Sequence, residues 1–573
     1  MRIIRWLALG LAVLFSCVAI FLLVKSHSEI VRLVADLSGF EQVDKISGQL
    51  TPYRYRLLRV VPIFMIALCC AVAWRPALVL SPLLALRNAA REGLLFLRSA
   101  WREMPTWERL VVGAILLITA GIRIGMALTE PVQVDEAMTW LLFTSRGPLV
   151  AWSYYAAPNN HILHSLFTTI TAWLPVGPTV AMRIPPILAA VLAQVFLYPI
   201  LRRRAGAPGA LIGLVLVSFS FPFLYYGYLS RGYMLVLLAF IVAYGATLRV
   251  IRNGGTNALV ILSVACVVGL FTMPSFLYPT ALLFGLALIL CHGADPRATR
   301  WGLLRSGLVV GLTTAVLYAP AVLMSGVAAF TSNQWVKPTG RADVVARWWP
   351  HFRDTFDWMT GIPIGIYVVF SVALLLPIAL RGPDRGVVRF NVLLLAGSLV
   401  IPLVHSVIPF ERTWIYLLVP IAMNFGMLVR MVAKDRPYGL PVALILSVLL
   451  ATWMFKTYRR TIPEYEYMAY DARGMYQAIQ DVEPKAIYCE FVVMGDHLVY
   501  ELRSRGSAFT YDLSPEGVER ESSLVDGNHT VLIVRREAPI NDPRFQEFYS
   551  DPIQLVYVRK DLSSIASPGQ QIP

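Results

Sequence analysis

Long apolar runs separated by short polar segments make up most of the sequence. A helix that crosses a bilayer core needs roughly 20 apolar residues, and about 13 runs approach that length. The first run follows Arg2 and Arg5 as a signal peptide would, but it lacks a small-residue cleavage site and predicts a retained helix. The expected spans are 4–24, 57–74, 109–128, 184–201, 207–226, 231–248, 257–273, 275–291, 302–324, 361–380, 390–409, 413–430 and 437–455. The pattern therefore predicts a mainly α, polytopic transmembrane protein.

Composition supports this fold class. The chain has 573 residues, of which 57% are hydrophobic and 15% are charged, whereas soluble proteins carry about 25% charged residues. The net charge of +15 would suit a nucleic-acid partner, but the basic residues lie in short clusters between apolar runs and not on one polar face. We therefore expect membrane lipids as partners and no nucleic acid. Cys489 is the one cysteine of the C-terminal tail, so this tail is expected to form no internal disulfide.

The basic clusters also predict the orientation of the chain. Cytoplasmic loops are enriched in Lys and Arg, and every basic cluster falls on the same side of an alternating topology. The clusters are Arg75 to Arg102, Arg202 to Arg204, Arg249 and Arg252, Arg297 and Arg300, Arg381 to Arg389, and Lys434 and Arg436. This pattern places the N-terminus in the cytoplasm and, with an odd number of spans, the C-terminus outside.

The first cytoplasmic segment has a helical pattern of its own. In an ideal helix Arg87, Arg91, Arg98 and Arg102 would lie within roughly 60° of one another. Leucines occupy the adjoining face, which is typical of a helix lying on the inner leaflet with its arginines near anionic lipid. A docking site for a partner is the alternative.

Three parts of the chain follow from these patterns. Residues 1–106 form a two-span extension with the basic amphipathic segment, 107–455 a transmembrane core, and 456–573 a small α/β extracytoplasmic domain. In the last part we expect strands over 486–493, 530–534 and 553–558, with helices around 465–480 and 497–505. A structural or acceptor-guiding role is expected for this domain, because it shows no nucleotide-binding glycine signature.

The first outer loop, residues 129–182, is where we expect the chemistry. Asp135 and Glu136 follow the third span by a few residues, and a Pro-Asn-Asn-His segment ends at His161. Segments 137–144 and 162–174 are too short or too polar to span, so we expect helices lying along the outer surface. Two later outer boundaries hold Ser230-Arg-Gly-Tyr233 and Arg412-Thr-Trp-Ile-Tyr416.

This arrangement resembles the membrane-embedded C-type glycosyltransferases, which include the protein O-mannosyltransferases and the bacterial lipid A aminoarabinose transferase. The matching features are the Asp-Glu pair, the Pro-Asn-Asn-His segment, the opening of the next span at Arg183, and the two later segments. The resemblance covers roughly 107–455, and the first two spans lie outside it. It implies that a sugar moves from a polyprenyl-phosphate donor to a hydroxyl of a cell-envelope glycan, glycolipid or protein, with inversion, on the outer face of a bacterial inner membrane.

The residues agree with the chemistry that the resemblance implies. A sugar hydroxyl needs a proton acceptor as it attacks, and Asp135 is the candidate general base, with Glu136 beside it to orient a cation or bind the acceptor. The departing lipid phosphate needs positive charge. The candidates for phosphate binding are Arg231, Arg412 and Lys337, and those for substrate binding are Asn160, His161, Tyr228 and Tyr233.

Each of these candidates has a structural alternative. The two acids could cap a surface helix, the arginines could be interfacial anchors, and the tyrosines could belong to the interfacial aromatic belt. A Mg²⁺ or Mn²⁺ ion held by Asp135, Glu136 or His161 is also left open, although His161 and His164 lack a matched third ligand.

Two other classes of function compete with a transferase. A transporter or lipid flippase would place ionisable residues near the bilayer midplane and show inverted repeats, and the sequence shows almost no charges inside the runs and no clear repeat. A non-catalytic assembly protein is the third class, and it predicts that Asp135 is dispensable.

Overall fold

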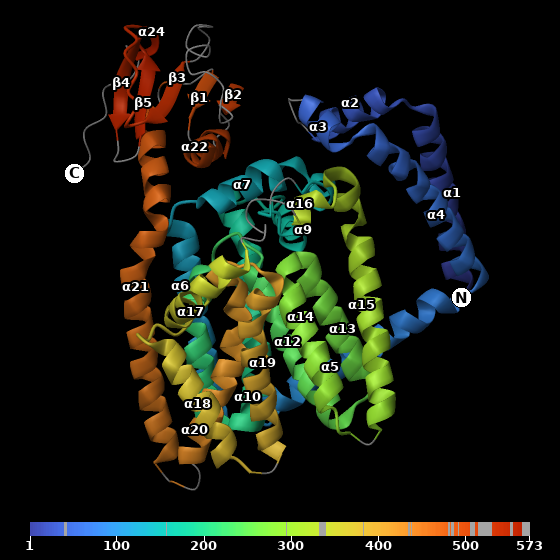
Figure 1. Cartoon of the computed structure of the whole chain (residues 1–573), viewed down its shortest axis with the longest axis vertical. Helices are drawn as coiled ribbons and strands as arrows, with labels where there is room; N and C mark the ends of the chain where they lie inside the picture. The colour runs from blue at the N-terminus through green and yellow to red at the C-terminus, as the bar shows by residue number, and fades with distance from the viewer. Residues whose placement is uncertain are drawn as a thin grey trace.

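The computed structural model is a bundle of long helices, with shorter helices and a small sheet at one end (Figure 1). We call this end the sheet end. The structure describes residues 1–38, 43–155, 158–293, 295–331, 340–381, 383–433, 436, 438–479, 482, 486–490, 492–504, 510–513, 530–550 and 554–563.

The predicted apolar runs all lie on helices. Within the described residues, nine helices are long and apolar enough to cross a membrane. The helices are α1 (Arg2–Val24), α2 (His27–Ser38), α3 (Val43–Gln49), α4 (Pro52–Trp74), α5 (Ala77–Arg102), α6 (Thr106–Thr129), α7 (Val134–Leu142), η1 (Thr144–Arg146), α8 (Pro148–Ser153), α9 (Ile162–Thr171), α10 (Pro178–Ser218), α11 (Phe221–Tyr225), α12 (Tyr233–Asn253), α13 (Thr256–Thr272), η2 (Pro274–Phe276), α14 (Leu277–Leu290), α15 (Pro296–Ser325), α16 (Ala328–Thr331), α17 (Arg341–Thr360), α18 (Gly365–Ala379), α19 (Pro383–His405), η3 (Glu411–Leu417), α20 (Leu418–Ala433), α21 (Gly439–Ile479), α22 (Val492–Ser504) and α24 (Lys560–Ser563). The predicted polytopic helical fold is confirmed, but not the expected number of 13 spans: among the described residues, α13, α14 and α18 have fewer than 18 residues, and two expected spans share α10.

Two spans differ from the simple pattern. The runs 184–201 and 207–226 both contribute to α10, which breaks at Gly206, where φ is +64° and favours glycine. Much of the segment between the expected spans 302–324 and 361–380 is the helix α17, which is bent by 88° from α18. Its many charged and tryptophan residues lower its hydropathy, so an apolar-run criterion does not detect it.

Helices α10 and α20 approach each other through two glycines. A Cβ built on Gly426 would lie 2.7 Å from the carbonyl oxygen of Gly209. A side chain at either position would therefore meet backbone, which cannot move aside as a flexible side chain does. The contact joins the first half of the core to the last, and the site described below is built from both halves.

Substituting Gly209 with Ala is expected to destabilise the protein by about 1–3 kcal/mol, because the added methyl overpacks this helix contact. Thermal unfolding in detergent measures the effect as a lower Tm. Gly113→Ala is the matched control, since a Cβ on helical Gly113 would meet no atom within 4 Å. Equal melting temperatures for the two variants would contradict the close contact.

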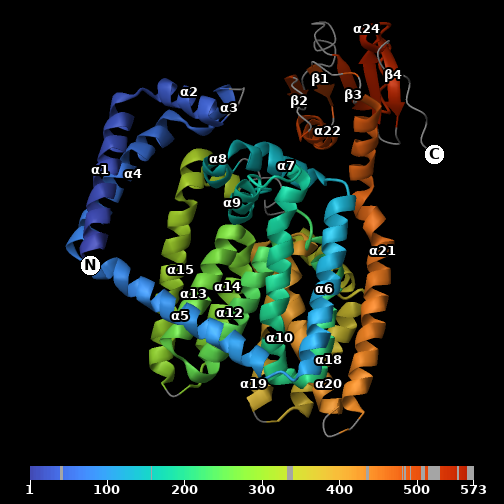
Figure 2. The same ribbon diagram turned by 180° about the vertical axis from the view of Figure 1, so that it is seen from behind.

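The N-terminal helices stand apart from the bundle. Helices α1 and α4 pack on each other and lean away from the core in both views (Figures 1 and 2). Arg54 connects α4 to α15 by donating to the carbonyl oxygen of Met324 at 3.0 Å. The predicted basic amphipathic segment forms α5, which packs on α13, and its Glu92 pairs with Arg249 of α12.

A five-stranded sheet lies near the C-terminus, with the order β2-β1-β3-β5-β4. Its strands are β1 (Ala486–Cys489), β2 (Thr510–Leu513), β3 (Val531–Arg535), β4 (Phe545–Ser550) and β5 (Gln554–Arg559). Strand β1 pairs parallel with β2 and β3, whereas β5 pairs antiparallel with β3 and β4. Three of these strands were expected, and the expected helices lie within α21 and α22. The sequence pattern missed β2 and β4, which are edge strands without a continuous apolar run.

Helix α21 connects the sheet to the bundle without a break. It has 41 residues and runs along the side of the bundle into the sheet (Figures 1 and 2). Its last turns pack under the strands through Met475 and Ile479, which join one apolar cluster with Ile487 and Val531. The sheet is thus attached by a long helix to the membrane core.

Candidate active site

The first loop folds into short helices across the sheet end of the bundle, as Figure 1 shows for α7 and α9. Asp135 and Glu136 lie in the first turn of α7, after the cap residue Gln133. Glu136 accepts the backbone N–H of Gln133 at 3.0 Å, and the Gln133 side chain accepts the N–H of Glu136 in return. This capping box satisfies two helix-end donors and defines where α7 begins.

The carboxylate of Glu136 is enclosed by N–H donors. Arg183 of α10 donates to it from Nε at 3.0 Å and from Nη2 at 2.6 Å, and the backbone N–H of Ser230 donates at 2.7 Å. The Glu136 and Arg183 side chains are both 0% exposed. The remaining Arg183 donors reach three carbonyl oxygens, those of Ala127, Glu130 and Pro131. Glu136 thereby ties the loop to α10 and to the segment before α12.

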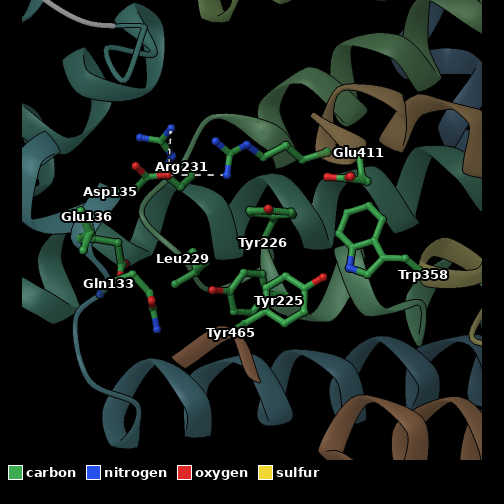
Figure 3. A pocket seen from close by; sticks show the side chains of 12 residues that line it. Gln133, Asp135, Glu136, Tyr225, Tyr226, Leu229, Arg231, Trp358, Glu411 and Tyr465 are labelled. Atoms are coloured by element: carbon green, nitrogen blue, oxygen red, sulfur yellow. Dashed lines mark hydrogen bonds and ion pairs between the residues drawn. The ribbon is translucent and has the colours of Figure 1, made fainter. Parts of the chain in front are cut away.

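Asp135 is placed quite differently from its neighbour. Its side chain is 38% exposed and faces two guanidinium groups: Nη2 of Arg231 lies 3.4 Å from Oδ2, and Nη1 of Arg412 lies 3.8 Å from the same oxygen. Figure 3 shows Asp135 and Arg231 together at one end of a pocket. Both distances exceed the 2.7–2.9 Å typical of a tight charge-assisted hydrogen bond. Asp135 is therefore held near two cations without being enclosed by them.

The pocket has a volume of about 340 Å³. Beyond the acids and arginines, aromatic side chains and a second carboxylate line it. The lining residues are Gln133, Val134, Asp135, Glu136, Tyr225, Tyr226, Leu229, Arg231, Trp358, Glu411, Arg412 and Tyr465. They come from α7, α11, α17, η3, α21 and the segment before α12, which are far apart in sequence. Trp358, Glu411 and Tyr465 were not among the expected site residues.

The Pro-Asn-Asn-His segment forms hydrogen bonds with Arg231 and with the next residue, Gly232. Its Nη1 donates to the backbone and side-chain oxygens of Asn159. The Nδ1 atom of His161 accepts the backbone N–H of Gly232 at 2.8 Å. Burial and the nearby Arg231 lower the pKa of His161 well below its ordinary value, and burial lowers the pKa of His164 to about 3. Both imidazoles are neutral at physiological pH and add no charge beside Arg231.

The other expected substrate-binding residues are not among those that line the pocket. Asn160 is buried, and its amide donates to the carbonyl oxygens of Ala151 and Tyr154, so it supports the loop fold. Tyr228 is buried and donates to Glu466. Tyr233 lies under the guanidiniums of Arg231 and Arg412, each 5.9 Å from the ring centroid. Lys337 lies outside the described residues.

The donor atoms present do not suit a divalent metal ion. Both oxygens of Glu136 accept N–H bonds, His161 Nδ1 accepts from Gly232, and Asp135 faces two cations. In the part of the chain that the structure describes, no group of three or more His, Cys, Asp and Glu side chains is arranged to hold a metal.

The C-terminal region contacts the same helix that carries the acids. Tyr500 of α22 forms a hydrogen bond of 2.7 Å with the Thr179 hydroxyl, and its ring meets Trp140 of α7 edge to face at 6.4 Å. Val499 and Tyr500 share an apolar cluster with Ala137 and Leu141 of α7. This contact joins positions more than 300 residues apart. A local sequence pattern therefore does not predict it.

The chain is similar in fold to a solved structure of another protein. The similarity is to ArnT from Cupriavidus metallidurans bound to undecaprenyl phosphate, with a TM-score of 0.55 and 14% identity over 81% of this chain and 100% of that chain. The apo state of that ArnT has a TM-score of 0.46 at 13% identity, over 81% of this chain and 99% of that chain. The arabinosyltransferase EmbB from Mycobacterium smegmatis has a TM-score of 0.39 at 12% identity, over 86% of this chain and 49% of that chain. No protein-family model and no curated protein matches the sequence.

Proposed function

We propose that this protein is a glycosyltransferase that moves a sugar from a polyprenyl-phosphate carrier to a hydroxyl acceptor. One observation carries the proposal: in a glycosyltransferase fold, the partly exposed carboxylate of Asp135 faces a pocket beside two guanidinium groups. A base and a cationic phosphate site are the two groups that such a transfer needs. The ArnT structure with the same fold binds undecaprenyl phosphate, which supports a lipid carrier here.

We propose that the sheet end faces outward. At the opposite end, Arg204 and Arg430 surround Asp384, and Arg202 pairs with Glu108. Arg202 and Arg204 belong to one of the basic clusters of the sequence, which mark the cytoplasmic side under the positive-inside rule. The Asp135 pocket then opens outside, where a lipid carrier and not a cytoplasmic nucleotide sugar supplies the donor.

The reaction is a single displacement. Asp135 accepts the proton of the acceptor hydroxyl as its oxygen bonds to the anomeric carbon, while the bond from that carbon to the phosphate oxygen breaks. The lipid phosphate leaves as an anion and is stabilised by Arg231 and Arg412, whose planar guanidiniums suit phosphate oxygens. Because one displacement occurs without an enzyme nucleophile, the anomeric configuration inverts. Glu136 stays paired with Arg183 throughout and keeps α7 in place.

The direct experiment is sugar transfer by the purified full-length protein. It is supplied with polyprenyl phosphates carrying labelled hexoses or pentoses and with lipid, glycan and protein acceptors from the cell envelope. We expect label to move to an acceptor and free polyprenyl phosphate to appear in equal amount. If no donor in the set yields transfer or release of free polyprenyl phosphate, the proposed function is wrong.

Substituting Arg412 with Ala is expected to weaken binding of bare polyprenyl phosphate by about 10- to 100-fold, because a charged hydrogen bond contributes about 1.5–3 kcal/mol. Arg412→Lys should keep part of the affinity, since an ammonium retains charge but lacks the planar fork. Direct binding of labelled lipid measures both variants. Arg353→Ala is the control, because Arg353 is an exposed cation of α17 that pairs with Asp354 outside the pocket lining. Equal binding by Arg412→Ala and Arg353→Ala would exclude Arg412 from the phosphate site.

A further inference from the structure

The pocket has a second end, which the proposed proton transfer does not use. Figure 3 shows Glu411 and Trp358 there, away from Asp135. The rings of Tyr225 and Tyr465 also line this part, and they pack on each other with centroids 5.7 Å apart. We call these four residues the aromatic-acid end. They come from η3, α17, α11 and α21.

Two polar groups at the aromatic-acid end form no hydrogen bond with the described residues. The indole Nε1 of Trp358 is buried and has no hydrogen-bond partner among the described residues. The Glu411 side chain is 50% exposed, and its carboxylate lies 3.7 Å from Nδ1 of His351, beyond hydrogen-bond range. Nε2 of that imidazole accepts from Trp414 at 3.0 Å, which leaves the neutral ring with its proton on Nδ1. A buried indole N–H without a partner is unfavourable unless a ligand supplies an acceptor.

This combination of groups fits a sugar ring. A carboxylate accepts hydrogen bonds from two hydroxyls, and an indole N–H donates to a hydroxyl oxygen. Flat aromatic rings supply apolar surface for the C–H face of the ring, and such a pocket with a few placed polar groups is the usual form of a small-molecule site. A sugar that carries its own carboxylate would be repelled by Glu411.

We propose, on the basis of the proposed function, that Glu411 and Trp358 bind the glycosyl group carried by the lipid phosphate, and that this group lacks a carboxylate. The chain itself links the two ends, because Glu411 and Arg412 are consecutive residues of η3 whose side chains reach opposite ends of one pocket. In the lipid donor, the sugar is bonded directly to an oxygen of the phosphate that Arg412 binds. In this proposal the sugar extends from the phosphate along the pocket toward Glu411. Glu411 determines which sugar is transferred and does not take part in proton transfer.

The test compares binding of four ligands by the full-length protein: bare undecaprenyl phosphate and the same lipid carrying glucose, arabinose or glucuronic acid. The wild-type protein is expected to bind at least one neutral form more tightly than the bare lipid, and the glucuronyl form no more tightly. Glu411→Gln should lower the ratio between the affinity for that neutral form and the affinity for the bare lipid by at least fivefold. Its affinity for the bare lipid should stay unchanged. Trp358→Phe should reduce the same gain, because it keeps a ring but removes the indole N–H.

Asp354→Asn is the matched control, since Asp354 is a carboxylate of α17 outside the pocket lining, 59% exposed. It should bind all four lipids as the wild type does. Several results would overturn the proposal: no sugar-dependent gain in the wild type, a gain retained by Glu411→Gln, or tight binding of the glucuronyl lipid. Loss of bare-lipid affinity in Glu411→Gln would also overturn it, because Glu411 would then act through Arg412. Binding requires no turnover, so these results are independent of whether transfer occurs.

Discussion

Replacing Asp135 with Asn is expected to lower the rate of sugar transfer by about 10²- to 10⁴-fold, the usual contribution of a positioned general base. The amide keeps the size of the side chain but does not accept the hydroxyl proton at neutral pH. The measurement is the initial rate of label transfer at saturating donor. A variant that transfers at the wild-type rate would show that Asp135 is dispensable, as the non-catalytic assembly class predicts.

Lipid binding distinguishes this chemical role from a structural one. Asp135 lies 3.4 Å from Arg231 and 3.8 Å from Arg412, so it competes with a phosphate for both guanidiniums. Removing its charge should leave the affinity for bare polyprenyl phosphate equal or higher while the rate falls. Asp343→Asn, at a carboxylate of α17 that pairs with Arg347 outside the pocket, should change neither quantity. A joint loss of binding and rate in Asp135→Asn would instead indicate a misfolded loop.

Hydropathy located the apolar part of the fold, because the predicted runs lie largely on helices, although two runs share α10 and others form helices of fewer than 18 residues. The criterion failed where charge and tryptophan interrupt the apolar pattern. Helix α17 has this composition and supplies Trp358 to the pocket. Its low hydropathy explains why neither the helix nor this site residue was predicted. Sequence reasoning that searches for lipid-facing surface overlooks helices that face a polar site.

The placement of Asp135 a few residues after the long apolar helix α6 was also predictable, because it follows from span length and loop order. The different surroundings of Asp135 and Glu136 were not predictable from the sequence. Adjacent carboxylates look equivalent in a sequence, and they differ here because residue 136 meets Arg183, 47 positions later, while residue 135 meets the pocket. Long-range pairing of this kind is decided by tertiary packing and leaves no periodic signal.

Replacing Glu136 with Gln is expected to destabilise the protein by about 3–5 kcal/mol, because Arg183 would be left as a buried cation without its partner. Transfer should be lost as well, although Glu136 takes no part in proton transfer. The carboxylate accepts N–H groups from Arg183, Ser230 and Gln133, so its loss releases α7 from α10 and from the segment that carries Arg231. Thermal unfolding in detergent and the initial transfer rate measure the two effects.

The double variant Glu136→Leu with Arg183→Leu separates stability from positioning. A buried ion pair replaced by apolar side chains is often neutral or stabilising, so the double variant should recover much of the Tm lost by Glu136→Gln. Its transfer rate should stay low, because the N–H groups of Ser230 and Gln133 still lack the acceptor that aligns them with α7. Recovery of both Tm and rate would mean that the α7 position does not depend on this carboxylate. Recovery of Tm alone would show that the pair is retained for the geometry of Asp135 more than for the stability of the fold.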